Sequence, residues 1–157
     1  MMHVVICDDE PCFQEAVVNA VKKWMCTSGH SDIRCTVFSS SEDLLERWSN
    51  GLSIDLLFLD IEIPGEISGM ALAQKIRDTD HNLPIIFITN YLNYVYEGYV
   101  VNAMRFLTKP VNENEIFTCM DISYRHFQLL NKESFCLSKT KSPTTSLVSS
   151  SFKVLLF

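Results

Sequence analysis

The sequence has no long uninterrupted apolar run. None approaches the ~18 residues that a membrane-spanning helix requires, and the apolar start at residues 1–6 meets Asp8 too soon for a signal peptide. The chain of 157 residues has about the length of one domain, and 47% of its residues are hydrophobic, enough for a full core. We therefore expect a globular domain that stays in the cytoplasm and does not enter the membrane.

Cysteine and histidine groups with metal-ligand spacing are also missing. None of the six cysteines belongs to a C-x-x-C pair, and the four histidines share no such spacing. Reduced, mostly buried thiols are the simplest interpretation of these cysteines. We assign no site to the histidines.

Basic residues are scarce over most of the chain. The formal net charge is −6, and residues 131–157 hold four lysines against one glutamate, so residues 1–130 carry −9. Nucleic-acid binding needs a basic face, which this composition does not favour. The excess of carboxylates favours a bound cation, although a solvated acidic surface is the ordinary explanation.

The sequence does contain a regular alternation of strand-like and helical segments. Apolar runs typical of buried strands cover residues 3–7, 33–38, 54–60, 85–89 and 103–108. A segment with helical spacing of apolar residues follows each of them, although residues 91–100 have low helix propensity. This alternation predicts a parallel sheet with helices on both faces and right-handed crossovers.

Capping residues predict several helix ends. Pro11 suits a helix start, and Gly29 and Gly51 are expected to end the first two helices. Ser39 with Glu42 matches a capping box at the start of the second helix.

The last part of the chain has a different composition. Nine of the fourteen residues 138–151 are Ser or Thr, which cannot form a core alone. The short apolar pieces at 135–137 and 152–157 would add strands only against a partner surface. We therefore divide the chain into a domain at 1–130 and a tail at 131–157.

Polar residues stand at the ends of the predicted strands. Asp8 and Asp9 follow the first strand, and Asp60 ends the third. Thr89 ends the fourth strand, and Lys109 follows the fifth. Because parallel strands all end on one side of a sheet, these side chains should meet at one edge, where open α/β sheets bind ligands.

This set of side chains has a definite chemistry. Carboxylates held together repel, so at neutral pH they take up a proton or bind a cation, and oxygen ligands favour Mg²⁺ over zinc. A metal-held carboxylate such as Asp60 can act as a nucleophile towards phosphorus. Lys109 would then neutralise the transferred phosphoryl group, and Thr89 would donate a hydrogen bond to it. Each of these residues alone could have an ordinary structural role at the end of a strand. Such roles do not explain why all of them are expected at the same edge of the sheet.

These residues belong to an ordered set of short motifs. The set comprises Asp8-Asp9-Glu10, Phe58-Leu59-Asp60, Pro64-Gly65, Thr89 and Lys109-Pro110. Over residues 3–130 it resembles the receiver domains of two-component response regulators. The resemblance implies an α/β fold of the flavodoxin type, (βα)5 and doubly wound, with five parallel strands in the order 2-1-3-4-5. It also implies a switch rather than a turnover enzyme, with at most slow self-phosphorylation and self-dephosphorylation.

The resemblance assigns the phosphoacceptor and the metal ligands. It implies that Asp60 accepts a phosphoryl group from a sensor histidine kinase. Asp9 and Asp60 would ligate Mg²⁺ directly, the backbone carbonyl of Glu62 would be a third ligand, and Asp8 would act largely through water.

The resemblance also assigns the switch. Thr89 and Lys109 would hold the phosphoryl oxygens, and Phe106 stands at the position of the family's switch aromatic, although a plain core role explains it nearly as well. The family often forms homodimers through the fourth helix, the fifth strand and the last helix. On that face this chain has tyrosines at 94, 96 and 99.

Finer features resemble the LytTR-type branch (LytR/AlgR-like regulators). They are residues 59–65, Phe87-Ile88-Thr89 followed by two tyrosines, and 101–110. That branch carries a C-terminal DNA-binding domain of roughly a hundred residues, too large for the 27 residues of the tail. The tail is then the truncated start of such a domain or an unrelated segment, and DNA binding is expected only with a full effector domain. The segment 65–69 is one residue longer than the commonest spacing.

Two other functions remain open. An aspartate-nucleophile phosphatase of the haloacid-dehalogenase kind also uses a strand-end Asp, Mg²⁺, Thr and Lys, but the D-x-D-G-T motif is absent after Asp60. A pseudo-receiver that only makes protein contacts would not need the intact set of site residues.

Overall fold

The fold is a five-stranded parallel sheet. The structure is a computed structural model that describes residues 1–90, 93 and 99–139. The strands are β1 (Met2–Cys7), β2 (Ile33–Phe38), β3 (Leu56–Leu59), β4 (Ile85–Thr89) and β5 (Arg105–Thr108). They lie in the order β2-β1-β3-β4-β5, and every neighbouring pair is parallel. The predicted fold class and strand order are confirmed.

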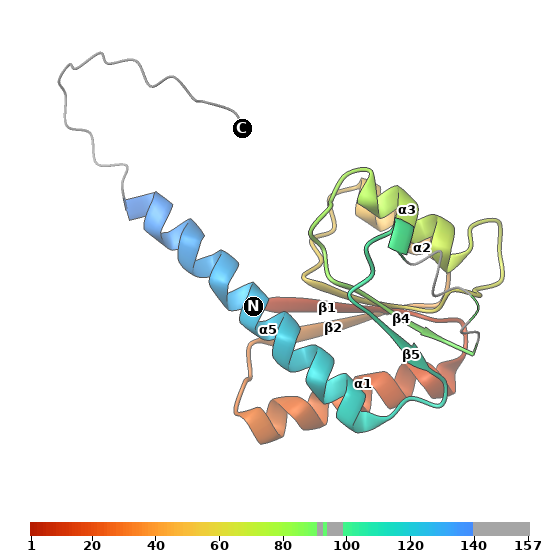
Figure 1. The fold of residues 1–157 in the computed structure, drawn as a ribbon, viewed down its shortest axis with the longest axis horizontal. Helices are drawn as coiled ribbons and strands as arrows, with labels where there is room; N and C mark the ends of the chain where they lie inside the picture. The colour runs from red at the N-terminus through yellow and green to blue at the C-terminus, as the bar shows by residue number, and fades with distance from the viewer. Residues whose placement is uncertain (91–92, 94–98, 140–157) are drawn as a thin grey trace, which may run out of the picture.

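Helices cover both faces of the sheet. The described helices are α1 (Pro11–Ser28), α2 (Ser41–Ser49), α3 (Gly69–Arg77) and α5 (Glu113–Lys139). In Figure 1, α1 and α5 lie on one side of the strands, and α2 and α3 lie on the other. Most of the helix predicted at 91–100 lies outside the described residues.

The alternation of side chains along the strands builds two separate cores. Along β1, Val4 and Ile6 face α1 and α5, whereas Val5 and Cys7 face α2 and α3. The same alternation divides β3 and β4 between the two clusters, as expected for strands buried on both faces. Because both faces are covered, polar groups of the central strands can only gather at the strand ends.

The first two helices end close to the predicted glycines. Gly29 follows α1 with a left-handed backbone (φ 73°), and Gly51 (φ 91°) lies two residues after the last residue of α2. A left-handed backbone at these positions is the reason that glycine is favoured there.

The start of α2 differs from the prediction by one residue. The N-cap is Ser40, whose backbone is extended and whose Oγ accepts a hydrogen bond from the Asp43 amide at 3.1 Å. The Ser39 hydroxyl instead accepts a hydrogen bond from the side chain of Gln14 at 3.0 Å. The capping box assigned to Ser39 and Glu42 is therefore wrong, and the Glu42 carboxylate faces the loop after β3.

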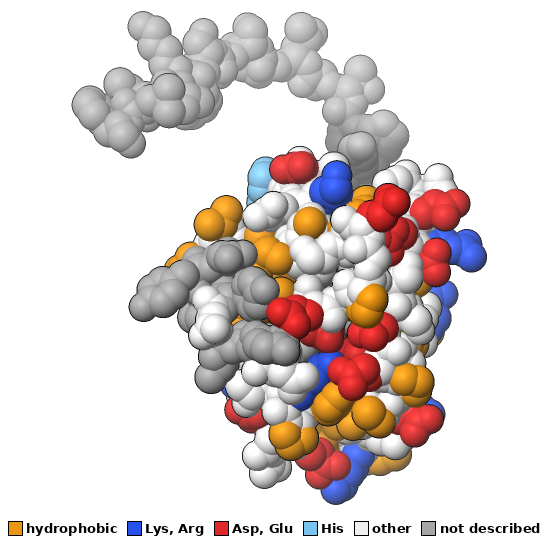
Figure 2. All heavy atoms as spheres, turned by 90° about the vertical axis from the view of Figure 1, so that its right-hand side faces the viewer, with side chains coloured by type: hydrophobic (Ala, Val, Ile, Leu, Met, Phe, Trp, Pro, Cys, Tyr) orange, Lys and Arg blue, Asp and Glu red, His pale blue; other side chains and the backbone are white. Residues whose placement is uncertain are grey.

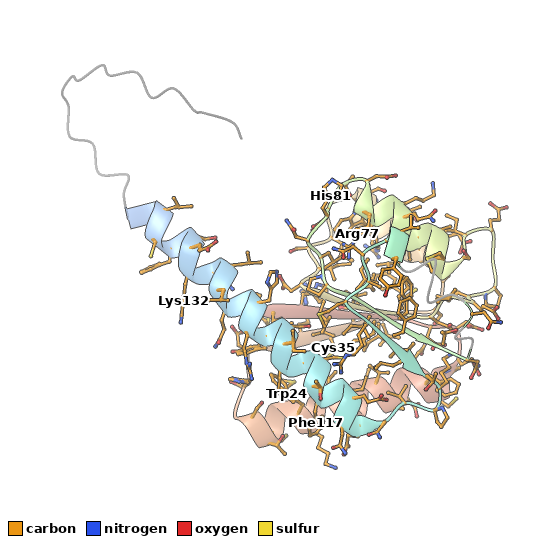
Figure 3. All side chains as sticks on the ribbon, in the orientation of Figure 1. Trp24, Cys35, Arg77, His81, Phe117 and Lys132 are labelled. Atoms are coloured by element: carbon orange, nitrogen blue, oxygen red, sulfur yellow. The ribbon has the colours of Figure 1, made fainter. Side chains whose placement is uncertain are left out.

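Helix α5 is longer than expected. It continues through residues 131–139, and residues 135–137 are helical rather than extended. Figure 1 shows its second half projecting past the sheet, and Lys132 lies on that part in Figure 3. The domain boundary predicted at residue 130 thus falls inside a continuous helix.

Among the described helices, none combines the length and the apolar character that crossing a membrane requires.

Candidate functional site: an acidic cluster at the carboxyl edge of the sheet

Three aspartates from two neighbouring strands lie together. Asp8 and Asp9 follow β1, Asp60 follows β3, and the Asp60 amide donates to the Cys7 carbonyl oxygen at 2.9 Å. One carboxylate oxygen from each aspartate lies within 4.8 Å of the others. Figure 2 faces this edge of the sheet and shows acidic side chains gathered around a basic one. The structure thus brings the three predicted carboxylates together.

Lys109 lies in the middle of this cluster. Its Nζ is 2.8 Å from Asp8 Oδ2 and 2.8 Å from Asp60 Oδ2, and its side chain is 1% exposed. Glu10 adds a third carboxylate oxygen at 3.1 Å. The Phe13 ring lies below the ammonium, with its centroid 4.2 Å from Nζ. A single buried cation therefore holds carboxylates from two loops.

Burial and charge act in opposite directions on these groups. Burial lowers the pKa of Lys109, but the hydrogen bonds that Lys109 donates to Asp60 and Asp8 outweigh this effect, so the pKa stays above its ordinary value. Burial raises the pKa of Asp8, and the hydrogen bond from Lys109 only partly offsets this effect. Asp60 adds to the rise through repulsion. The lysine is therefore held charged, while burial makes the charged form of Asp8 less favourable than it is in water.

Backbone amides fix the directions of two carboxylates. Asp8 Oδ1 accepts from the Glu10 amide at 2.9 Å, and Asp60 Oδ1 accepts from the Glu62 amide at 3.1 Å. The side-chain amide of Gln14 donates to the Asp8 carbonyl oxygen. Each carboxylate thereby presents its other oxygen to Lys109.

Gly69 packs directly on the backbone of the phosphoacceptor candidate. Its amide donates to the Ile61 carbonyl oxygen at 2.8 Å. A Cβ atom at this position would lie 1.8 Å from the Asp60 carbonyl oxygen. Only a glycine allows α3 to begin this close to the site.

The two other predicted residues lie on β4 and β5. Thr89 is the last residue of β4 and is fully buried. It pairs in register with Thr108, the residue before Lys109. Phe106 is half-buried and stacks on Phe87, with a centroid distance of 5.1 Å. The position of Phe106 fits both interpretations made from the sequence, a switch aromatic and a core residue.

The residues at this edge fit a magnesium ion. The donors are hard carboxylate oxygens from three aspartates, which lie within 4.8 Å of one another. Their mutual repulsion makes binding of a cation favourable. The Glu62 amide donates to Asp60 Oδ1 at 3.1 Å, so the Glu62 backbone lies beside the cluster.

Sequence reasoning did not assign roles to several contributors. Glu10 was part of the motif but was not expected to contact Lys109. Phe13, Gln14 and Gly69 have ordinary sequence contexts, and only the three-dimensional arrangement shows their contacts.

Comparison with known families agrees with this geometry. The response regulator receiver domain family matches residues 4–121 of the chain. The chain therefore belongs to the response regulator receiver domain family. This result confirms the resemblance inferred from the sequence and argues against the haloacid-dehalogenase alternative.

Curated relatives point to one group of regulators. Accessory gene regulator protein A of Staphylococcus aureus (strain N315) is 30% identical over 138 residues, which cover 85% of this chain and 58% of that protein. The same protein of Staphylococcus epidermidis is 28% identical over equal shares. This similarity agrees with the LytTR-type branch. The chain spans less than two thirds of the length of these relatives.

Solved structures share the fold. The response regulatory domain of protein mrkE from Klebsiella pneumoniae is 26% identical, with a TM-score of 0.71 over 82% of this chain and 99% of that chain. The response regulator TrrA from Thermotoga maritima, solved in complex with Mg²⁺ and BeF, is 26% identical, with a TM-score of 0.65. That match covers 78% of this chain and 99% of TrrA.

Proposed function

We propose that the chain accepts a phosphoryl group on Asp60 from a sensor histidine kinase and acts as a phosphorylation-dependent switch. In this step a carboxylate oxygen of Asp60 forms a bond to phosphorus, and the bond from phosphorus to the kinase histidine nitrogen breaks. The observation that carries the proposal is the buried Asp60 carboxylate held by Lys109 beside two further aspartates. This combination supplies a nucleophile and the charges that an incoming phosphoryl group needs.

Asp8, Asp9 and Asp60 would hold Mg²⁺ together with the Glu62 carbonyl oxygen. When bound, the ion would neutralise charge on the phosphoryl oxygens. Asp9 is more exposed than its two neighbours, so it is accessible to a cation arriving from solvent. The amide of Glu62 keeps the Asp60 carboxylate oriented. That TrrA was solved with Mg²⁺ supports the assignment.

Lys109 and Thr89 would hold the phosphoryl oxygens after transfer. Lys109 already contacts Asp60 Oδ2 at 2.8 Å, so it needs little movement to follow a group attached there. Thr89 ends the neighbouring strand and would donate its hydroxyl proton. A change at Thr89 would reach Phe106, which stacks on Phe87 in the same strand as Thr89.

The same proposal includes the cellular compartment, the rate of self-phosphorylation, the oligomeric state and DNA binding. All six cysteines lie in the described residues and are free thiols, which suits the reducing cytoplasm where a kinase would act. Self-phosphorylation and self-dephosphorylation would be slow at most. A homodimer would use the fourth helix, β5 and α5. DNA binding would require an effector domain in addition to residues 1–130.

Phosphorylation by a small donor tests the proposal. We expect incubation with acetyl phosphate and Mg²⁺ to add the mass of one phosphoryl group to the intact protein, and chelation of Mg²⁺ to prevent it. The Asp60→Asn variant should gain no mass. Absence of any adduct on the wild-type protein would instead support a pseudo-receiver, and an adduct on the Asp60→Asn variant would contradict the assignment of Asp60.

A further inference from the structure

The loop between β3 and α3 is held from outside by a residue of α2. Glu42 Oε1 accepts a hydrogen bond from the Ile67 amide at 2.8 Å. The Glu66 backbone amide also contributes to the lowered pKa of this carboxylate. Both residues belong to the segment 65–69. A carboxylate that accepts several backbone amides is a strong and directional anchor.

Gly65 lets the carboxylate approach the loop. A Cβ atom at Gly65 would lie 2.6 Å from Glu42 Oε1, and the residue has φ 145°, which favours glycine. The missing Cβ atom of Gly65 thus leaves the space that the Glu42 carboxylate occupies next to the loop.

Glu42 is itself fixed in place. The Ser40 hydroxyl, which caps α2, donates to Glu42 Oε2 at 3.2 Å. Hydrogen bonds from its own amide and from the Ile67 amide hold the pKa of Glu42 below its ordinary value. The residue therefore remains a charged acceptor at neutral pH.

Backbone hydrogen bonds also hold the two ends of the loop, and the Ile63 side chain is buried in the core between them. At its start, the Glu62 amide donates to Asp60 Oδ1 at 3.1 Å. At its end, the Gly69 amide donates to the Ile61 carbonyl oxygen at 2.8 Å. Glu42 accepts the hydrogen bond of the Ile67 amide in the second half of the loop. Glu62 lies between Asp60 and Ile67 in the chain, so its backbone belongs to the segment that these contacts hold.

We propose that Glu42 is a positioning residue for the magnesium site, because it holds the loop that carries the Glu62 carbonyl oxygen. The inference rests on the proposed function, since it assigns a task to that same site. Glu42 does not touch the metal or the phosphoryl group. It acts through the loop, so its loss should weaken metal binding more than it slows the chemical step.

Amide NMR of Glu42→Ala tests this in two steps. In metal-free protein, we expect the Ile67 amide to exchange with solvent faster than in the wild type, because its acceptor is gone. In a Mg²⁺ titration, we expect the dissociation constant to rise about tenfold, the lower end of the effect typical for residues that orient metal ligands. The rate of phosphorylation by acetyl phosphate at saturating Mg²⁺ should stay unchanged.

Two further variants complete the test. Glu46→Ala removes an exposed carboxylate of α2 one turn later and should leave exchange and Mg²⁺ affinity at wild-type values. Glu42→Gln keeps one oxygen acceptor and should lie between the wild type and Glu42→Ala. Equal Mg²⁺ affinity of Glu42→Ala and Glu46→Ala would overturn the role of Glu42 alone. No Mg²⁺ binding by the wild-type protein would overturn the proposed function and the inference with it.

Discussion

At the scale of single residues, the site is a balance between one buried ammonium and several carboxylates. Lys109 neutralises part of the charge of Asp8 and Asp60, yet the pKa of Asp8 remains above its ordinary value because burial outweighs the hydrogen bond. Burying the negative charge of Asp8 beside Asp60 is therefore unfavourable, even with Lys109 present. A divalent cation at these carboxylates would reduce this repulsion.

The raised pKa of Asp8 predicts a pH-dependent stability. In the folded protein Asp8 keeps its proton at pH values where the unfolded chain, with a pKa near 3.8, has lost it. The contribution of Asp8 to stability is thus largest below that value and falls as pH rises through the folded pKa. We expect Asp8→Asn to become more stable relative to the wild type as pH rises from about 4 to about 7.

Urea unfolding in the presence of a chelator measures this difference. Asp78→Asn, which changes an exposed aspartate at the end of α3, is the control for the loss of one carboxylate. A difference that shrank with rising pH would contradict the raised pKa of Asp8.

At the scale of the elements, the loops do more than connect strands and helices. The loop after β3 has buried side chains at Ile61 and Ile63, and it meets both α2 and the start of α3. Gly69 is the residue at which this packing is tightest. An alanine there would favour the helix by about 1 kcal/mol on propensity alone, but the Asp60 backbone occupies the space of its Cβ atom.

We therefore expect Gly69→Ala to destabilise the protein by about 3 kcal/mol, the upper range for overpacking. It should also slow phosphorylation by acetyl phosphate, because Asp60 must move. Gly29→Ala has open space around its Cβ and should cost less, about 1 kcal/mol for its left-handed backbone, without slowing phosphorylation. Urea unfolding and intact mass measure both effects. Equal phosphorylation rates for the two variants would contradict the contact with Asp60.

Most of the strands and helices were predictable from the sequence, and the features that were not have physical reasons. The apolar runs before Asp60 and Thr89 located two buried strands and the edge where they end, because local composition determines burial on both faces. The start of α2 was misplaced by one residue, because Ser39 and Ser40 are both able to cap a helix and tertiary contacts decide between them. The contacts of Glu42 were not predictable, because they join segments 25 residues apart.

At the scale of the whole molecule, each of the two cores contains one buried cysteine thiol. Cys7 and Cys119 are buried in opposite cores, and burial raises the pKa of Cys7 to about 12 and that of Cys119 to about 11. By contrast, the exposed thiols are those of Cys12, Cys26 and Cys136. The thiols therefore report on the integrity of both faces of the sheet.

We expect a thiol reagent such as iodoacetamide to modify the three exposed cysteines quickly in the native protein, because the reagent can reach them. The two buried cysteines should react only after unfolding in urea. Peptide mass mapping after timed labelling distinguishes the sites. Fast labelling of Cys7 or Cys119 in the native protein would contradict the packing of the corresponding core.

The length of α5 has a mechanical consequence. The helix is held on the domain through the contact of Trp24 Nε1 with Asp121 Oδ1 at 2.8 Å and the aromatic stack of Tyr124 against His30. Figure 3 shows Trp24 between α1 and α5. Beyond Phe127 the helix continues for twelve residues to Lys139, about 18 Å at 1.5 Å per residue, and Figure 1 shows this end projecting past the sheet. A tilt of about 10° near Phe127 would therefore move the far end of this segment by about 3 Å.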